Sequence, residues 1–142
     1  MTDTSLGFRF RFRMSGAPPT IMKITVADTS FVRGDMANLE SGQLDLAVTT
    51  DAAIVGMINE TKSGMTAGTD TIEIITDGDA VYGVYDANAR LIGATLDISG
   101  ATGAQTVGAS SGKEFVVYAT SSATQETLVM INRDAHYQTK TS

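Results

Sequence analysis

Hydrophobic and cationic residues alternate without a break in the segment Phe8-Arg9-Phe10-Arg11-Phe12-Arg13-Met14. A period of two is typical of a β-strand with one buried and one exposed face, whereas a helix would scatter the three phenylalanines around its circumference. Burial of one phenylalanine ring contributes about 1.5–3 kcal/mol before the entropy cost of ordering it. The pattern therefore predicts a strand whose phenylalanines face a core and whose arginines face water or carboxylates.

Short apolar or alternating runs separated by turn residues continue through the rest of the chain. We expect further strands over residues 21–26, 36–39, 44–48, 53–58, 71–76, 81–85, 90–98, 105–107, 115–119 and 128–131. The run 53–58 is continuously apolar, which favours a strand buried on both faces. Asp77-Gly78-Asp79 is a turn signal, so the runs on either side of it are predicted to form a hairpin.

About ten short strands with turns at regular spacing predict an all-β fold. The architecture we expect is a compact antiparallel β-barrel or sandwich with an extended N-terminal β-arm. A chain of 142 residues fits one such domain. Pro18 and Pro19 cannot donate to a ladder and separate the first strand from the next. We therefore assign residues 1–20 to the arm, 21–134 to a single β domain and 135–142 to a polar C-terminal tail.

Charge divides the chain unevenly. Residues 1–23 carry four basic side chains and one acidic one, residues 24–142 carry six basic and fifteen acidic ones, and the net charge is −6. A basic segment on an acidic body suggests docking onto an acidic surface, such as the body of a sister subunit. The pattern fits equally well a strand that completes its own barrel with its arginines in solvent. So few basic residues on an acidic chain form a poor phosphate footprint, and no nucleic-acid partner is expected.

The composition limits the remaining classes. The chain has no cysteine, which excludes disulfides and thiolate metal sites. Its N-terminus lacks the basic and apolar regions of a secretory signal, and no apolar run approaches the roughly 18 residues of a membrane-spanning helix. We therefore expect synthesis in a cytoplasm and no membrane partner.

One segment matches a hydrolase motif. Gly108-Ala109-Ser110-Ser111-Gly112 has the G-x-S-x-G pattern, and Asp134 and His136 follow in the order of a catalytic triad. A nucleophile elbow leads from a strand into a helix, whereas the residues that follow this motif predict a strand. We therefore expect no enzyme, and His136, the single histidine, is expected to be a packing or surface residue.

Three aspartates could gather oxygens around a cation. Asp77, Asp79 and Asp86 lie close together in the sequence, but their spacing is not that of an EF-hand loop and no glutamate closes it. Asp77-Gly78-Asp79 is first a turn signal. No cofactor or metal is therefore expected, and cation binding by the three aspartates stays an open alternative. Arg33-Gly34-Asp35 likewise reads as a turn before a strand rather than as a cell-adhesion tripeptide.

A series of turns and strands follows in the middle of the chain. Gly34-Asp35-Met36-Ala37-Asn38-Leu39-Glu40-Ser41-Gly42-Gln43-Leu44, followed by Ala53-Ile54-Val55-Gly56-Met57, gives a Gly-Asp turn, a short strand, a second turn and a buried strand. This order resembles small β proteins that decorate the capsids of tailed bacteriophages. The later stretches Leu91–Ser99 and Thr127–Asn132 resemble the same family, so the resemblance spans about residues 31–132.

The resemblance to these decoration (cement) proteins implies a β-tulip or barrel-like domain, often a trimer, seated on the outside of the shell. It implies a structural virion protein that stabilises the head, with an N-terminal arm that reaches neighbouring subunits and no catalytic residues. Its partners would be the major capsid protein and further copies of itself. The segment Phe8 to Met14 would then make the contact.

A second class of function stays open from the residues. A carbohydrate- or receptor-binding β module of a phage tail or fibre would also be an all-β protein. Such a site is expected to be rich in exposed aromatic residues, and the aromatic content of 6% argues against it.

Overall fold

The computed structural model describes residues 6–49, 51, 53–88, 90–109, 113–121 and 123–137 of the chain. These residues form eleven β-strands. The strands, in chain order, are β1 (Phe8–Arg13), β2 (Ile21–Thr25), β3 (Met36–Glu40), β4 (Gln43–Leu46), β5 (Ile54–Met57), β6 (Thr71–Ile75), β7 (Ala80–Tyr85), β8 (Thr95–Ser99), β9 (Thr106–Ala109), β10 (Phe115–Ser121) and β11 (Glu126–Ile131). Within the described residues no helix is long and apolar enough to cross a membrane.

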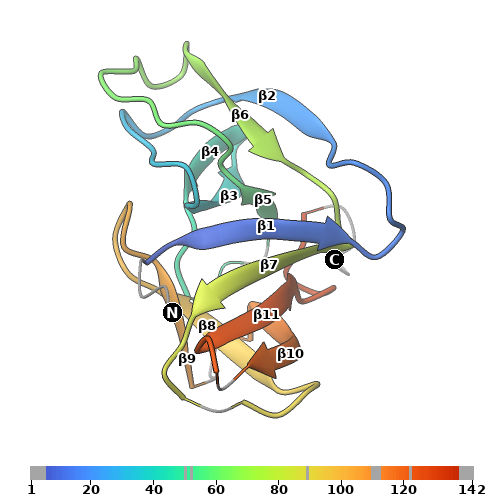
Figure 1. The fold of residues 1–142 in the computed structure, drawn as a ribbon. Helices are drawn as coiled ribbons and strands as arrows, with labels where there is room; N and C mark the ends of the chain where they lie inside the picture. The colour runs from blue at the N-terminus through green and yellow to red at the C-terminus, as the bar shows by residue number, and fades with distance from the viewer. Residues whose placement is uncertain are drawn as a thin grey trace.

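The strands form three antiparallel sheets (Figure 1). The largest has the order β1-β7-β11-β10-β8-β9, and the smaller sheets have the orders β2-β6 and β4-β3-β5. In Figure 1 the six-stranded sheet occupies the lower part of the molecule and the small sheets lie above it, with β1 at the boundary. The predicted all-β antiparallel class is confirmed in the form of packed sheets, and the ladders between the described strands do not close into a barrel.

Two hydrophobic cores fill the space between the sheets. The main core joins the inner side of the six-stranded sheet, including Phe115 and Val129, to Ile54 and Met57 of β5. The second core lies among the small sheets and includes Val55 of the same strand. All four residues of β5 are buried. The prediction of a strand buried on both faces is therefore confirmed for β5, which contributes to both cores.

Strand β5 passes so close to its neighbours that one position admits no side chain. A Cβ atom on Gly56 would lie 1.9 Å from the carbonyl oxygen of Ile75 and 3.0 Å from the hydroxyl oxygen of Tyr82. The φ angle of Gly56 is 153°, a conformation that L residues rarely adopt. Glycine is thus required where β5, β6 and β7 meet.

The predicted hairpin between residues 71–76 and 81–85 is wrong. Strand β6 pairs with β2, whereas β7 pairs with β1 and β11 in the other sheet. The chain turns a corner between sheets at Asp77-Gly78-Asp79, because the two carboxylates bind distant partners. Asp77 accepts a hydrogen bond from the Thr20 amide at 2.7 Å, and Asp79 accepts one from Arg13 Nε at 2.7 Å.

Two other turns differ in how well the sequence predicts them. The turn at Ser41-Gly42 joins β3 and β4 as expected, with positive φ angles of 52° and 79° that suit a two-residue hairpin. The expected strand over residues 90–98 instead begins only at Thr95. Its first half is a turn in which the Ala94 amide donates to the Leu91 carbonyl at 3.0 Å, since Gly93 has a φ of 86° that ends an extended chain.

We expect Gly56→Ala to lower the free energy of unfolding by about 3 kcal/mol or more, because the added methyl group overlaps the Ile75 carbonyl. Urea unfolding followed by circular dichroism measures the change. The matched control is Gly108→Ala in β9, where a Cβ atom meets nothing within 4 Å and the expected change is within about 0.5 kcal/mol. Equal effects of the two substitutions would contradict the close approach.

Candidate interaction surface at strand β1

The first half of β1 is anchored in the main core by its aromatic side chains. Phe8 is 3% exposed and stacks on Phe115 with ring centroids 5.1 Å apart. Phe10 meets the fully buried Tyr82 edge-on at 6.3 Å. Such pairs contribute beyond the area they bury. The prediction that the phenylalanines face a core is confirmed for these two residues.

The second half of β1 changes face at a β-bulge. Phe10 pairs with Tyr82 and Phe12 with Val81, so Arg11 is an extra residue that no residue of β7 opposes. A slip of one residue moves the following side chains to the other side of the sheet. Phe12 accordingly lies against Tyr118, with ring centroids 5.7 Å apart, and is 38% exposed. The prediction of three buried phenylalanines on one face is therefore wrong for Phe12.

The arginines of β1 bind carboxylates of their own chain. The Glu126 carboxylate in β11 forms an ion pair with Arg11 and lies 3.8 Å from Arg9. Glycine at position 83 makes room for this cluster, since a Cβ atom there would lie 2.5 Å from a Glu126 oxygen. The positive charge of the N-terminal segment is thus compensated within the molecule at this point of the sheet.

Arg13 joins the end of β1 to the corner between the sheets. Its guanidinium donates to Asp79 at 2.7 Å and lies 3.4 Å from Asp77. Burial raises the pKa of Asp79, but hydrogen bonds from Arg13 and Ser15 outweigh it and leave that pKa below its ordinary value. The next residue, Met14, is an exposed apolar side chain. Strand β1 therefore combines buried anchors, internal ion pairs and exposed apolar groups.

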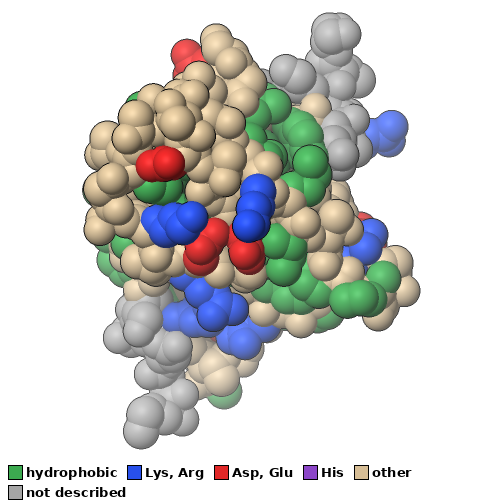
Figure 2. All heavy atoms as spheres, turned by 90° about the horizontal axis from the view of Figure 1, so that it is seen from above, with side chains coloured by type: hydrophobic (Ala, Val, Ile, Leu, Met, Phe, Trp, Pro, Cys, Tyr) green, Lys and Arg blue, Asp and Glu red, His purple; other side chains and the backbone are tan. Residues whose placement is uncertain are grey.

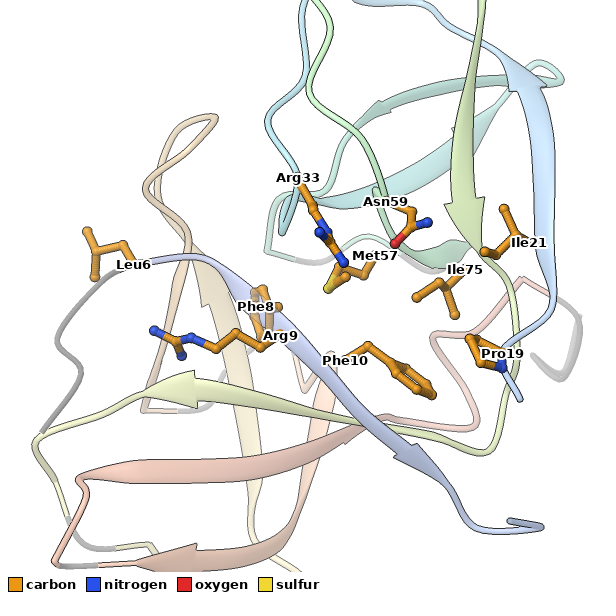
Figure 3. A pocket seen from close by; sticks show the side chains of 10 residues that line it. All are labelled: Leu6, Phe8, Arg9, Phe10, Pro19, Ile21, Arg33, Met57, Asn59 and Ile75. Carbon is orange, nitrogen blue, oxygen red and sulfur yellow. The ribbon is translucent and has the colours of Figure 1, made fainter. Parts of the chain in front are cut away.

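A groove of about 530 Å³ runs between β1 and the small sheets (Figure 3). Leu6, Phe8 and Phe10 line its β1 side. The opposite wall consists of apolar side chains from the other two sheets and the segment before β2, namely Pro19, Ile21, Met57 and Ile75. Arg9, Arg33 and Asn59 add polar groups to this lining.

The sequence alone did not single out this groove, because its walls come from segments far apart in the chain. Arg33 was assigned only to a turn, which is where the structure places it. Ile21 and Met22 are neighbours on β2 and are each 45% exposed, although neighbours on a strand point to opposite faces, and only the structure reveals this exposure. Figure 2 shows basic and acidic side chains side by side on the surface seen from above, next to hydrophobic areas.

The residues of the hydrolase motif do not form a described triad. Ser110 lies outside the described residues. Asp134 is exposed, whereas His136 is buried, with its Nε2 atom 3.2 Å from the Thr76 carbonyl oxygen. Burial lowers the pKa of His136, against the opposing effect of backbone hydrogen bonds to Thr76 and Val55. The histidine is a packing residue, which was one of the two roles expected of it.

The three aspartates considered for a cation serve different local contacts. Asp77 and Asp79 bind Arg13. Asp86 forms an ion pair with Arg90, with 2.6 Å between the Arg90 Nε atom and a carboxylate oxygen. Among the residues that the structure describes, no three histidine, cysteine, aspartate or glutamate side chains gather in a way that could hold a metal ion.

Alanine substitutions of Phe8 and Phe12 should distinguish the ring that anchors β1 in the core from the ring that lies at the surface. We expect Phe8→Ala to lower the free energy of unfolding by about 3–5 kcal/mol, because it opens a cavity beside Phe115. Phe12→Ala removes a half-exposed ring and should cost about 1 kcal/mol. Urea titration of both variants measures the difference, and a larger loss for Phe12→Ala would contradict the bulge.

The buried histidine should make stability depend on pH. The pKa of His136 is lower in the folded than in the unfolded chain, so the unfolded chain takes up a proton first and stability falls as the pH drops below about 6.5. His136→Gln removes this titration. We expect the natural protein to lose stability relative to the variant between pH 7.5 and pH 5.

The natural protein must be compared with the His136→Gln variant, because the titration of Asp45 changes stability in the direction opposite to that of His136. Burial, reinforced by Glu40, raises the pKa of Asp45 from 3.8 to about 6, so its contribution to stability improves as the pH falls through about 6 towards the lower value. This contribution is common to both proteins and cancels in their difference. Unfolding free energies that stay parallel across the pH range would show that His136 does not titrate differently in the folded state.

Comparison with known proteins gives a similarity of structure but none of sequence. No family model and no curated protein matches the sequence. The structure is similar to a chain in the capsid of Myoviridae phage XM1, with a TM-score of 0.51 and 17% sequence identity. The similarity covers 93% of this chain and 94% of that chain. At this identity the similarity shows a shared fold, which extends over nearly the full length of both chains.

Proposed function

We propose that the chain is a structural protein of a bacteriophage particle that binds the outside of the capsid and stabilises it by bridging capsid subunits. The observation that carries the proposal is the similarity of fold, over 93% of the chain, to a protein chain in the capsid of phage XM1. The turn-and-strand order of residues 34–57 independently resembles capsid decoration proteins. The protein acts in this proposal as a trimer whose N-terminal segment contacts its neighbours.

The contact surface in this proposal includes β1 and the residues on either side of it. Of the ten large hydrophobic side chains that are exposed in the described residues, five lie between residues 6 and 22. They are Leu6, Phe12, Met14, Ile21 and Met22. Their concentration in one segment of the chain supports an interaction surface around β1. Many copies on one shell would convert a modest contact at this surface into strong overall binding.

The main contact in this proposal is apolar rather than ionic. Arg11 and Arg13 already bind Glu126, Asp77 and Asp79 within the chain. Removal of residues 1–16 would also take Phe8 away from Phe115, so a truncated chain would report on folding as well as on binding. Point substitutions of exposed residues therefore test the surface more cleanly.

The first test is the copy number of the chain in purified particles from its source, measured by quantitative mass spectrometry against the major shell protein. We expect a ratio near one to one, because a protein that bridges shell subunits repeats with them. A small number of copies would favour the alternative of a tail or fibre module, and absence from particles would overturn the proposal.

The second test compares two exposed residues. Met14 and Val48 are each 53% exposed, but only Met14 belongs to the proposed surface. We expect Met14→Asp to weaken binding to particles by about tenfold or more, since it places a charge in an apolar contact, while Val48→Asp leaves binding unchanged. Thermal unfolding confirms that both variants fold. Equal binding by the two variants would exclude Met14 from the contact.

A further inference from the structure

The outer edge of β1 is unpaired for part of its length. β1 is an edge strand of the six-stranded sheet, and β7 pairs with one of its two edges. On its other side the Phe8 amide donates to the Gly34 carbonyl at 2.8 Å. Residues of an antiparallel strand direct their backbone groups alternately towards and away from the partner. Phe10 follows Phe8 by two residues and therefore directs its N–H and C=O groups away from β7. No strand of the described chain pairs with this edge.

The groove described above runs along this edge. Its far wall is apolar, with Ile21 nearly half exposed and Met57 and Ile75 buried beneath the surface. Figure 3 shows Ile21, Ile75 and Met57 across the groove from Phe8 and Phe10. An open strand edge beside an apolar groove has the two parts that strand addition requires, namely backbone groups for hydrogen bonds and an apolar surface that receives side chains.

The charged side chains that line the groove indicate what kind of segment can bind there. Among the described residues, its lining contains the guanidinium groups of Arg9 and Arg33 and no carboxylate, and Arg9 also lies 3.8 Å from Glu126. No ion pair joins Arg33 to another described residue, and its backbone amide donates to the Thr61 hydroxyl at 3.0 Å. A second copy of β1 is disfavoured, because it would place arginine opposite arginine. The complementary occupant carries carboxylates between apolar side chains.

We propose that β1 receives an extended segment of a partner chain as an added antiparallel strand. The segment alternates apolar side chains, which enter the groove against Ile21 and Met57, with carboxylates that reach Arg33. The backbone of the partner segment forms hydrogen bonds with the N–H and C=O groups of Phe10. In this proposal the edge of β1 accepts a strand from another chain. The proposed function above concerns a different contact, which is made by the exposed side chains around β1. The test below uses no particles, so its outcome is independent of the copy-number test.

The experiment uses the full-length protein labelled with nitrogen-15 and a blocked seven-residue peptide in which valine alternates with threonine and glutamate. Amide chemical shifts are followed up to about 1 mM peptide. We expect changes confined to β1, Arg33, Asn59 and Ile21, together with slower hydrogen exchange of the Phe10 amide. The control peptide has lysine in place of glutamate and should bind about tenfold more weakly or not at all.

Two variants test the role of charge. Arg33→Gln should reduce the affinity for the glutamate peptide by about tenfold, while Lys113→Gln, two residues before β10, removes the same charge elsewhere and should leave the affinity unchanged. Shifts outside the groove, equal binding of both peptides, an unaffected Phe10 amide, or no shift at the highest concentration would each overturn the proposal.

Discussion

The arrangement of the three sheets depends on the burial of one short strand on both of its faces. β5 contributes Ile54 and Met57 to the main core and Val55 to the second core. Because the same strand belongs to both cores, neither core can be repacked without moving the other. The close approach at Gly56 fixes how near β5 lies to β6 and β7, and that spacing in turn sets the positions of Met57 and Ile75 in the wall of the groove opposite β1.

The second constraint is electrostatic and lies where the chain passes from one sheet to another. Arg13, Asp77 and Asp79 connect the end of β1 to the corner between β6 and β7. Partly exposed ion pairs contribute little to stability singly. Their importance here is geometric, because the Asp77 carboxylate also holds the amide of Thr20 and so directs the chain towards β2. The position of Ile21 in the wall of the groove follows from that direction.

The sequence predicted those features that depend on local patterns. The apolar run of β5 and the turn at Ser41-Gly42 carry their structure in adjacent residues, so both were predicted correctly. The corner at Asp77-Gly78-Asp79 was predicted as a hairpin, because its turn residues suit either outcome and the choice is made by Arg13, more than sixty positions away. The bulge at Arg11 could not be predicted either, since a perfect alternation of phenylalanine and arginine gives no sign of a one-residue slip in strand register. The groove needs five separate segments and could be recognised only in three dimensions.

The pairing of β1 with β7 has a consequence for synthesis. β1 is synthesised before the other ten described strands, yet its partner strand begins at residue 80. During that interval three phenylalanines are in a nascent segment with no sheet to join, and such segments are prone to aggregate. The arginines between them keep the segment soluble, as charged residues do beside other hydrophobic strands. The same alternation thus protects the chain before folding and later supplies the ion pairs that hold β1 in place.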